Sequence, residues 1–139
     1  MNNEFKHVRV GCAVFLINEK DQILMGKRRG ELGGQTWAII GGHLEKYETL
    51  EHCLIREVME ETNLKVYYKH LVKVGFENTY VKELDRQYLT VYYKTRMFSG
   101  ELKNMEPDKC SEFRWFDLND LPSNIFSCLK GFLDKYDIS

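Results

Sequence analysis

The sequence has no long apolar run that could anchor it in a membrane. No stretch approaches the roughly 20 apolar residues of a membrane-spanning helix. The first residues, MNNEFKHVRV, lack the apolar core of a signal peptide. We therefore expect a cytoplasmic protein that engages no membrane.

A strong excess of one charge is also missing. The formal net charge is −1 at pH 7, with 20 Lys and Arg against 21 Asp and Glu. Proteins that bind DNA or RNA polymers usually carry a broad positive field. We therefore exclude a nucleic-acid polymer as partner and expect any anionic ligand to be bound by local groups.

Closely spaced cysteine pairs are absent as well. Cys12, Cys53, Cys110 and Cys128 are far apart, and no C-x-x-C motif occurs. Two of them lie in apolar or amphipathic stretches typical of a core. Reduced thiols in a cytosolic protein are the expected state.

The chain also lacks internal repeats and low-complexity linkers. With 139 residues and 43% hydrophobic residues, it has the size and composition of one domain with a continuous core. We expect a single domain over residues 1–139. The sequence leaves the oligomeric state open, and a homodimer is compatible with it.

Hydrophobic periodicity predicts a mixture of strands and helices. β-Branched and aromatic runs predict strands at 8–17, 23–28, 36–40, 64–78, 87–98 and 111–118. A charged segment, 79–86, bridges the fourth and fifth of these. Helical spacing appears at 48–62 and again within 121–136, where Ile125, Cys128, Leu129 and Phe132 recur. This pattern favours an α/β fold, an α/β/α sandwich built on a mixed sheet.

The helix predicted at 48–62 has an unusual apolar stripe. At 100° per residue, six residues lie within about 60° of one line along the helix: Leu50, Cys53, Leu54, Glu57, Glu60 and Glu61. The stripe thus begins apolar and ends in carboxylates. Three negative charges on one face need a cation among them, and oxygen ligands suit a hard divalent ion such as Mg²⁺.

The competing interpretation is a solvated acidic face, which is the usual fate of charge runs. Arg56 lies four residues before Glu60 and could form an ordinary surface ion pair with it. Such a pair contributes about 0.3–0.5 kcal/mol and carries no function by itself.

The segment from Gly42 to Leu64 (GHLEKYETLEHCLIREVMEETNL) resembles the Nudix box. Its matching positions, at the family's fixed spacing, are Gly42, Glu48, Arg56, Glu57, Val58, Glu60, Glu61 and Leu64. Asn63 replaces the family's usual glycine, and Ile40 stands where proline often precedes the double glycine. Asparagine is the next-best residue in the left-handed conformation that ends a helix, so we expect it to preserve the turn.

The resemblance extends over most of the chain, through KRRGELGGQTWAIIGGHLE and YLTVYYK to WFDLNDLP. The whole pattern is most similar to MutT-like nucleoside triphosphate diphosphatases. It implies a Nudix fold, a nucleotide substrate with a pyrophosphate linkage, and Mg²⁺ as cofactor, for which Mn²⁺ can substitute.

The same resemblance implies the metal ligands. Glu57, Glu60 and Glu61 would bind the ion directly, and the Gly42 carbonyl would add a neutral oxygen. One of these glutamates or a loop carboxylate would accept the proton of the attacking water, and we favour Glu57 for this role. Glu106, in the loop KNMEPDKCSE, is a further candidate ligand. Glu112 competes with it, and an exposed loop acid is the alternative for both.

Glu48 and Arg56 receive supporting roles. The angular count places Glu48 on the opposite side of the helix from Glu57, so we expect it to hold Arg56 or the loop. Arg56 would then orient the glutamates. The alternative for Arg56 is the surface ion pair described above.

Basic and aromatic residues supply candidates for substrate binding. Lys27, Arg28 and Arg29 end a strand before the glycine-rich loop and could meet phosphates, although solvated strand ends are common. His43 follows the double glycine and could contact substrate or pack on the turn. A base could stack on one of several aromatics, most of which should be core: Trp37, Phe76, Tyr80, Tyr88, Tyr92 and Trp115.

Three functions are compatible with these residues. The first is metal-dependent hydrolysis of a nucleoside triphosphate, deoxy or oxidised forms included, to a monophosphate and pyrophosphate. The second is hydrolysis of a nucleotide sugar or an ADP-ribose-like diphosphate, since the motif reads only the diphosphate. The third is a nucleotide sensor that does not cleave, but such a module would not need the complete glutamate set. Short loops and a small chain favour the first.

Overall fold

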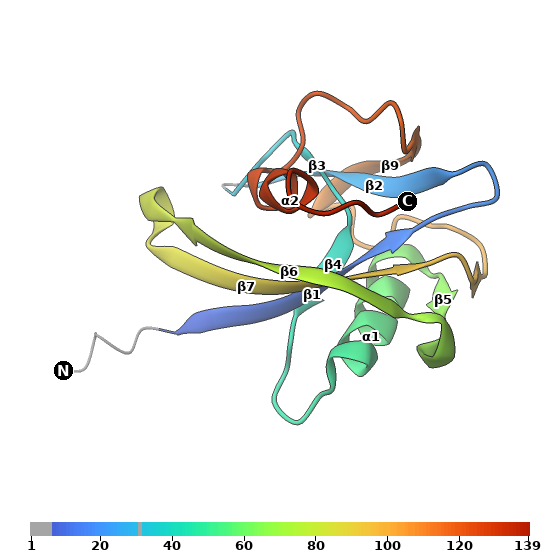
Figure 1. Cartoon of the computed structure of the whole chain (residues 1–139), viewed down its shortest axis with the longest axis horizontal. Coiled ribbons are helices and arrows are strands. Elements are labelled where there is room, and N and C mark those ends of the chain that lie inside the picture. The colour runs from blue at the N-terminus through green and yellow to red at the C-terminus, as the bar shows by residue number, and fades with distance from the viewer. Residues whose placement is uncertain (1–6, 31) are drawn as a thin grey trace.

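The computed structural model describes residues 7–30 and 32–139. The first six residues, on which part of the signal-peptide expectation rests, lie outside this range. In chain order the described elements (Figure 1) are β1 (Val8–Leu16), β2 (Gln22–Arg28), β3 (Trp37–Ala38), β4 (Ile40–His43), α1 (Leu50–Thr62), β5 (Lys65–Val66), η2 (Tyr68–His70), β6 (Val72–Val81), η3 (Lys82–Leu84), β7 (Arg86–Thr95), β8 (Phe98–Ser99), β9 (Cys110–Asp117) and α2 (Ser127–Leu133). Both predicted helices are present.

The strands form one mixed sheet and two smaller antiparallel ones. The largest sheet has the order β4-β1-β7-β6, in which β1 and β7 run parallel and the other pairs antiparallel. A second sheet has the order β3-β2-β9, and β5 pairs with β8. The predicted mixed sheet is confirmed.

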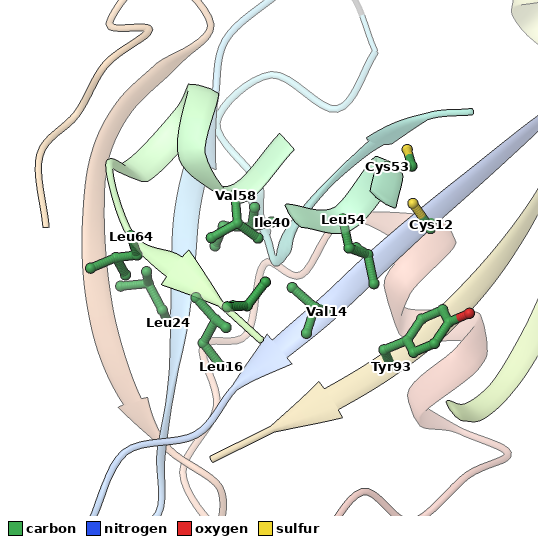
Figure 2. Close-up of a cluster of buried hydrophobic side chains, with 11 residues drawn as sticks. Cys12, Val14, Leu16, Leu24, Ile40, Cys53, Leu54, Val58, Leu64 and Tyr93 are labelled. Atoms are coloured by element: carbon green, nitrogen blue, oxygen red, sulfur yellow. The ribbon is translucent and has the colours of Figure 1, made fainter. Parts of the chain in front are cut away.

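Strand β1 has a core on each face, because successive side chains of a strand point to opposite sides. Cys12, Val14 and Leu16 pack with Cys53, Leu54 and Val58 of α1, and Figure 2 shows this cluster between the strand and the helix. Ala13, Phe15 and Ile17 pack on the other side with Leu129 and Phe132 of α2. One helix therefore lies on each face, which confirms the predicted α/β/α sandwich.

The strand predicted at 64–78 is wrong. The chain instead forms the short β5, the turn η2 and then β6, which continues to Val81. Leu64 and Val66 are buried, whereas Tyr68 is 60% exposed. β-Propensity reports only that each residue suits a strand. It does not reveal where the chain leaves the β5–β8 pair to enter the large sheet.

Helix α1 begins later than predicted and buries a different stripe. It starts at Leu50 because the Thr49 hydroxyl accepts a hydrogen bond from the His52 backbone N–H, an N-cap. Its buried residues are Cys53, Leu54, Val58 and Thr62. The angular count suggested that the apolar stripe ends in carboxylates, and this is wrong. The stripe continues through Val58 and Thr62, and Glu57 and Glu61 lie along its edge.

The C-terminal helix is shorter than the predicted amphipathic stretch. It starts at Ser127, so Ile125 lies before it and forms a bridge with Trp37. No helix in the described ranges is both long and apolar enough to cross a bilayer.

Asn63 ends α1 in the left-handed conformation, as predicted. Its φ is 65° and its backbone N–H donates to the Met59 carbonyl. Its side-chain amide also donates to the Glu101 carbonyl at 3.0 Å. This cap turns the chain away directly after Glu60 and Glu61.

We expect Asn63→Val to destabilise the fold by about 1 kcal/mol or more, because a β-branched residue is strained at positive φ. Asn63→Gly should be nearly neutral, since glycine relieves the backbone but loses the exposed hydrogen bond to Glu101. Thermal unfolding of both variants measures the difference. Equal melting temperatures for the Val and Gly variants would contradict this role of Asn63.

Candidate active site

A cavity of about 610 Å³ lies where the elements carrying the predicted residues meet. Its walls come from β1, β2, β4, α1 and β7, from the loop before β9 and from the start of α2. Among the predicted site residues, those that line it are Arg28, Arg29, Gly42, His43, Glu57, Glu61 and Glu106. Residues distant in sequence thus share one cavity.

Three carboxylates gather in one part of the cavity. Glu57 and Glu61 come from α1, and Glu106 comes from the loop before β9. Glu61 Oε2 is buried and has no hydrogen-bond partner within the described residues. Burial, helped by the neighbouring Glu57 and Glu106 carboxylates, raises the pKa of Glu61 to about 9. A buried carboxylate oxygen without a hydrogen-bond partner, next to two other carboxylates, is an arrangement that a bound cation would stabilise.

The carboxylates do not form a finished metal site. Across residues 7–30 and 32–139, no three His, Cys, Asp or Glu side chains converge as metal ligands. Glu57 Oε1 faces Arg56 Nη1 at 2.7 Å, and Glu106 Oε2 faces Lys109 Nζ at 3.7 Å. Each of these contacts involves one oxygen of a carboxylate that has two, so both carboxylates could hold a cation beside Glu61 through their second oxygen. The oxygen-only donor set still fits Mg²⁺ or Mn²⁺.

Gly42 lets the strand approach the acidic helix. A Cβ at this position would lie 2.2 Å from Glu57 Cδ and 2.4 Å from Glu57 Oε2. No side chain fits into that space. The backbone of β4 and the Glu57 carboxylate can be in contact only because residue 42 is glycine.

Arg56 binds several carboxylates at once. Its Nε donates to Glu48 Oε2 at 2.6 Å and its Nη2 to Glu48 Oε1 at 2.9 Å, a bidentate pair. Its Nη1 donates to Glu57 Oε1 at 2.7 Å, and its Nη2 to the His43 carbonyl at 3.3 Å. The hydrogen bonds from Arg56 lower the pKa of Glu48 to about 2. Arg56 thus ties the loop before α1 to Glu57.

Two details of the prediction change here. Glu48 precedes the N-cap of α1, so its placement on the far side of the helix is wrong, although it does hold Arg56. Glu60 is 51% exposed, pairs with Arg56 Nη1 at 3.2 Å and is not part of the cavity wall. The structure therefore separates Glu60 from the carboxylates of the cavity.

The basic residues differ in their positions. The Arg28 guanidinium lies 4.1 Å from the centre of the Phe126 ring, and its Nε donates to the Leu32 carbonyl. Arg28 forms no ion pair with the described residues, and burial lowers its pKa. Arg29 lines the cavity from an exposed position. Lys27 lies outside the wall, with Nζ 5.9 Å from the Trp37 ring.

Several choices left open by the sequence are decided by position. Glu106 lines the cavity, whereas Glu112 pairs with Arg114 at 3.0 Å on β9. His43 lines the cavity and stacks on Tyr88, with ring centres 5.9 Å apart. Of the aromatic candidates, Tyr88 and Tyr92 line the cavity.

Among the residues of the wall that sequence reasoning missed are Asn104, Lys109 and Phe126. Asn104 and Lys109 flank Glu106 in the same loop, so their proximity to a candidate ligand was the available signal. Phe126 carried none, because an aromatic residue before an amphipathic helix is usually core.

The chain is similar to known proteins over most of its length. The NUDIX domain model matches residues 6–136. The ADP-ribose pyrophosphatase of Methanocaldococcus jannaschii is 33% identical over 121 residues, covering 86% of this chain and 69% of that protein. The oxidized purine nucleoside triphosphate hydrolase of Mus musculus is 28% identical over 110 residues, covering 77% of this chain and 65% of that protein.

Other relatives are longer, and this chain spans 40% of the length of NAD-capped RNA hydrolases that it matches. Among solved structures, a MutT NUDIX hydrolase from Burkholderia pseudomallei superposes with a TM-score of 0.86 at 25% identity, covering 94% of this chain and 98% of that one. The relatives thus include proteins named for different substrates.

Proposed function

Because the chain belongs to the NUDIX family and is a Nudix pyrophosphohydrolase, we propose that it hydrolyses nucleoside triphosphates to a monophosphate and pyrophosphate. The observation that supports this most is the composition of one cavity. It contains the buried Glu61 Oε2, which has no hydrogen-bond partner among the described residues, beside Glu57 and Glu106. It also contains Arg28, which has no carboxylate partner among the described residues. Carboxylates for a cation and a guanidinium for phosphate are what a metal-bound polyphosphate needs.

Nudix hydrolases generally use a divalent metal, and we assign its binding here to Glu57, Glu61 and Glu106 with the Gly42 carbonyl. When bound, Mg²⁺ supplies charge neutralisation at the phosphates and lowers the pKa of water. Glu60 is exposed and paired with Arg56, so we do not assign it as a direct ligand of the metal. Mn²⁺ has the same preference for oxygen ligands and should substitute.

The chain's own residues would then position and deprotonate the water. The water oxygen forms a bond to one phosphorus, the anhydride P–O bond breaks, and the bridging oxygen leaves with pyrophosphate. We retain Glu57 as the group that accepts the water proton. Arg56 fixes its carboxylate through the 2.7 Å contact, and Glu48 in turn holds Arg56.

Arg28 and Arg29 would bind the phosphates. His43 and Tyr88 would line the part of the cavity that receives the nucleobase. Arg28 lies against the Phe126 ring and its Nε donates to the Leu32 carbonyl, so its guanidinium is oriented before substrate arrives. This preorganisation favours a planar, two-point contact with phosphate oxygens.

A second function is favoured by one comparison. The relative that is 33% identical is an ADP-ribose pyrophosphatase. The carboxylates of the cavity, through the metal, would recognise only the diphosphate part of a substrate. Hydrolysis of ADP-ribose or a nucleotide sugar is therefore the alternative. A sensor that does not cleave is disfavoured because Glu57, Glu60 and Glu61 are all present.

The test is a side-by-side kcat/KM measurement for dCTP, dGTP, oxidised dGTP and ADP-ribose with Mg²⁺. We expect a triphosphate to be the best substrate. Replacing both Arg28 and Arg29 by alanine should raise KM for the triphosphate more than for ADP-ribose, because the terminal phosphate exists only in the former. Lys27→Ala is the matched control, since Lys27 lies outside the cavity wall.

The two proposals differ in a measurable way. If ADP-ribose is preferred by about tenfold or more, equivalent to about 1.4 kcal/mol in transition-state binding, the triphosphate proposal is wrong and the alternative replaces it. Equal KM changes for both substrate classes would remove Arg28 and Arg29 from terminal-phosphate binding.

A further inference from the structure

We propose that Asn104 is a positioning residue: its side-chain amide holds the backbone of Glu106 and so places the Glu106 carboxylate in the cavity. The inference rests on the proposed function, in which Glu106 is a ligand of the metal. It concerns a residue that the Nudix box does not contain and that lies in the loop between β8 and β9.

The Asn104 amide joins the two ends of the turn that carries Glu106. Its Nδ2 donates to the Cys110 carbonyl at 2.8 Å, and its Oδ1 accepts from the Glu106 backbone N–H at 3.3 Å. The Glu106 carbonyl in turn accepts from the N–H groups of Lys109 and Cys110, at 2.9 and 3.1 Å. Glu106 is thus fixed through its own backbone N–H and carbonyl.

Both sides of this turn are anchored to the rest of the site. Met105 N–H donates to the Glu61 carbonyl at 3.1 Å, and Lys103 N–H donates to the Thr62 carbonyl at 2.9 Å. At the other end Cys110 begins β9 and pairs with Arg28. The turn therefore spans from the end of α1 to β2. The Asn104 side chain connects its two ends by hydrogen bonds to Glu106 and Cys110.

The side-chain contact of Glu106 is too weak to do this alone. Lys109 Nζ is 3.7 Å from Glu106 Oε2, and the Lys109 side chain is 71% exposed. Exposed ion pairs of this kind contribute little. The backbone held by Asn104 therefore decides where the Glu106 carboxylate lies. An amide suits the task because one planar group supplies both a donor and an acceptor.

The experiment compares Asn104→Ala and Asn104→Ser in the wild type and in a Glu106→Gln background. Serine can still accept from the Glu106 N–H but is too short to span the turn. The Mn²⁺ affinity and kcat of Asn104→Ser should therefore lie between those of the wild type and Asn104→Ala. Three quantities are measured: Mn²⁺ affinity by calorimetry without substrate, kcat, and KM. We expect Asn104→Ala to weaken Mn²⁺ binding and to lower kcat, each by about tenfold or more, with KM nearly unchanged.

Asn18→Ala is the matched control. Asn18 Oδ1 also accepts from two backbone N–H groups, those of Lys20 and Gln22, in a turn that is not part of the cavity wall. It should lose thermal stability to a similar extent and keep wild-type Mn²⁺ affinity and kcat.

The Glu106→Gln background separates positioning from general stability. If Asn104 acts through Glu106, neither Asn104 variant should reduce Mn²⁺ affinity or kcat further there. Full additivity of the two substitutions would overturn the inference and leave the proposed function intact. Wild-type Mn²⁺ affinity and kcat in Glu106→Gln alone would instead remove Glu106 from the metal site, and the inference would fall with that assignment. Should Asn104→Ala fail to fold, the serine variant gives the same comparison.

Discussion

Glu61→Gln is expected to lower kcat by on the order of a hundredfold or more while the protein remains folded, a loss comparable with removing one charge-stabilising group from an active site. Glutamine keeps the size of the side chain but lacks the negative charge that a divalent cation requires. Activity of the wild type should vanish with EDTA and return with Mg²⁺ or Mn²⁺. A Glu61→Gln enzyme with wild-type turnover would refute the assignment.

Thermal unfolding provides a second measurement on the same variant. The pKa of Glu61 is raised in the folded, metal-free protein by burial and by the adjacent carboxylates. A raised folded-state pKa of an acid gives stability that is complete below the unfolded pKa and is lost as pH rises toward about 9. Metal-free wild type should therefore lose stability relative to Glu61→Gln as pH increases through this window.

Bound metal should instead make the wild type more stable than Glu61→Gln. A ligand that binds only the folded state raises its stability by an amount that grows with ligand concentration. The melting temperature of the wild type should thus rise with Mg²⁺, and that of Glu61→Gln should rise much less. Equal Mg²⁺-induced shifts in both proteins would contradict a cation at Glu61.

Gly42→Ala is expected to have the second large effect. The new Cβ would lie 2.2 Å from Glu57 Cδ, so the carboxylate or the strand must move. Overpacking of this kind costs about 1–3 kcal/mol of stability. Turnover should fall by on the order of a hundredfold, because displacing a reacting group by about 1 Å has that effect.

The control for this prediction is the double variant Gly42→Ala with Glu57→Ala. Alanine at 57 removes the carboxylate that the new methyl group would strike, so the stability lost in Gly42→Ala should largely return. Turnover of the double variant should be no lower than that of Glu57→Ala alone. If Gly42→Ala keeps wild-type turnover, the observed position of the Glu57 carboxylate is not required for the reaction.

The sequence by itself determined the acidic helix and the fold class. The cap at Asn63 depends on one residue's backbone preference, and the motif from Gly42 to Leu64 lies within a strand, a loop and a helix that are contiguous in the chain. Alternating and helical periodicities record which side of an element is buried. For these reasons the mixed sheet and the two covering helices followed from local patterns alone.

Local patterns were weakest where the chain changes direction or where a side chain lies between two environments. Residues 64–71 contain leucine, valine and tyrosine side chains that suit a strand. They nevertheless form β5 and a turn in which Tyr68 is exposed to solvent. Similarly, Val58 and Glu57 are adjacent on α1. Only packing against β1 shows that Val58 faces the core and Glu57 its edge.

Only the tertiary structure decided which of several equivalent residues enters the cavity. Glu106 lies there and Glu112 does not, because the loop before β9 is hydrogen-bonded to the end of α1. Arg28 lies against Phe126, a residue from the other end of the chain, while Lys27 lies outside. Such choices depend on contacts between segments far apart in sequence, whose approach is set by the packing of the whole fold and leaves no periodic trace in any one segment.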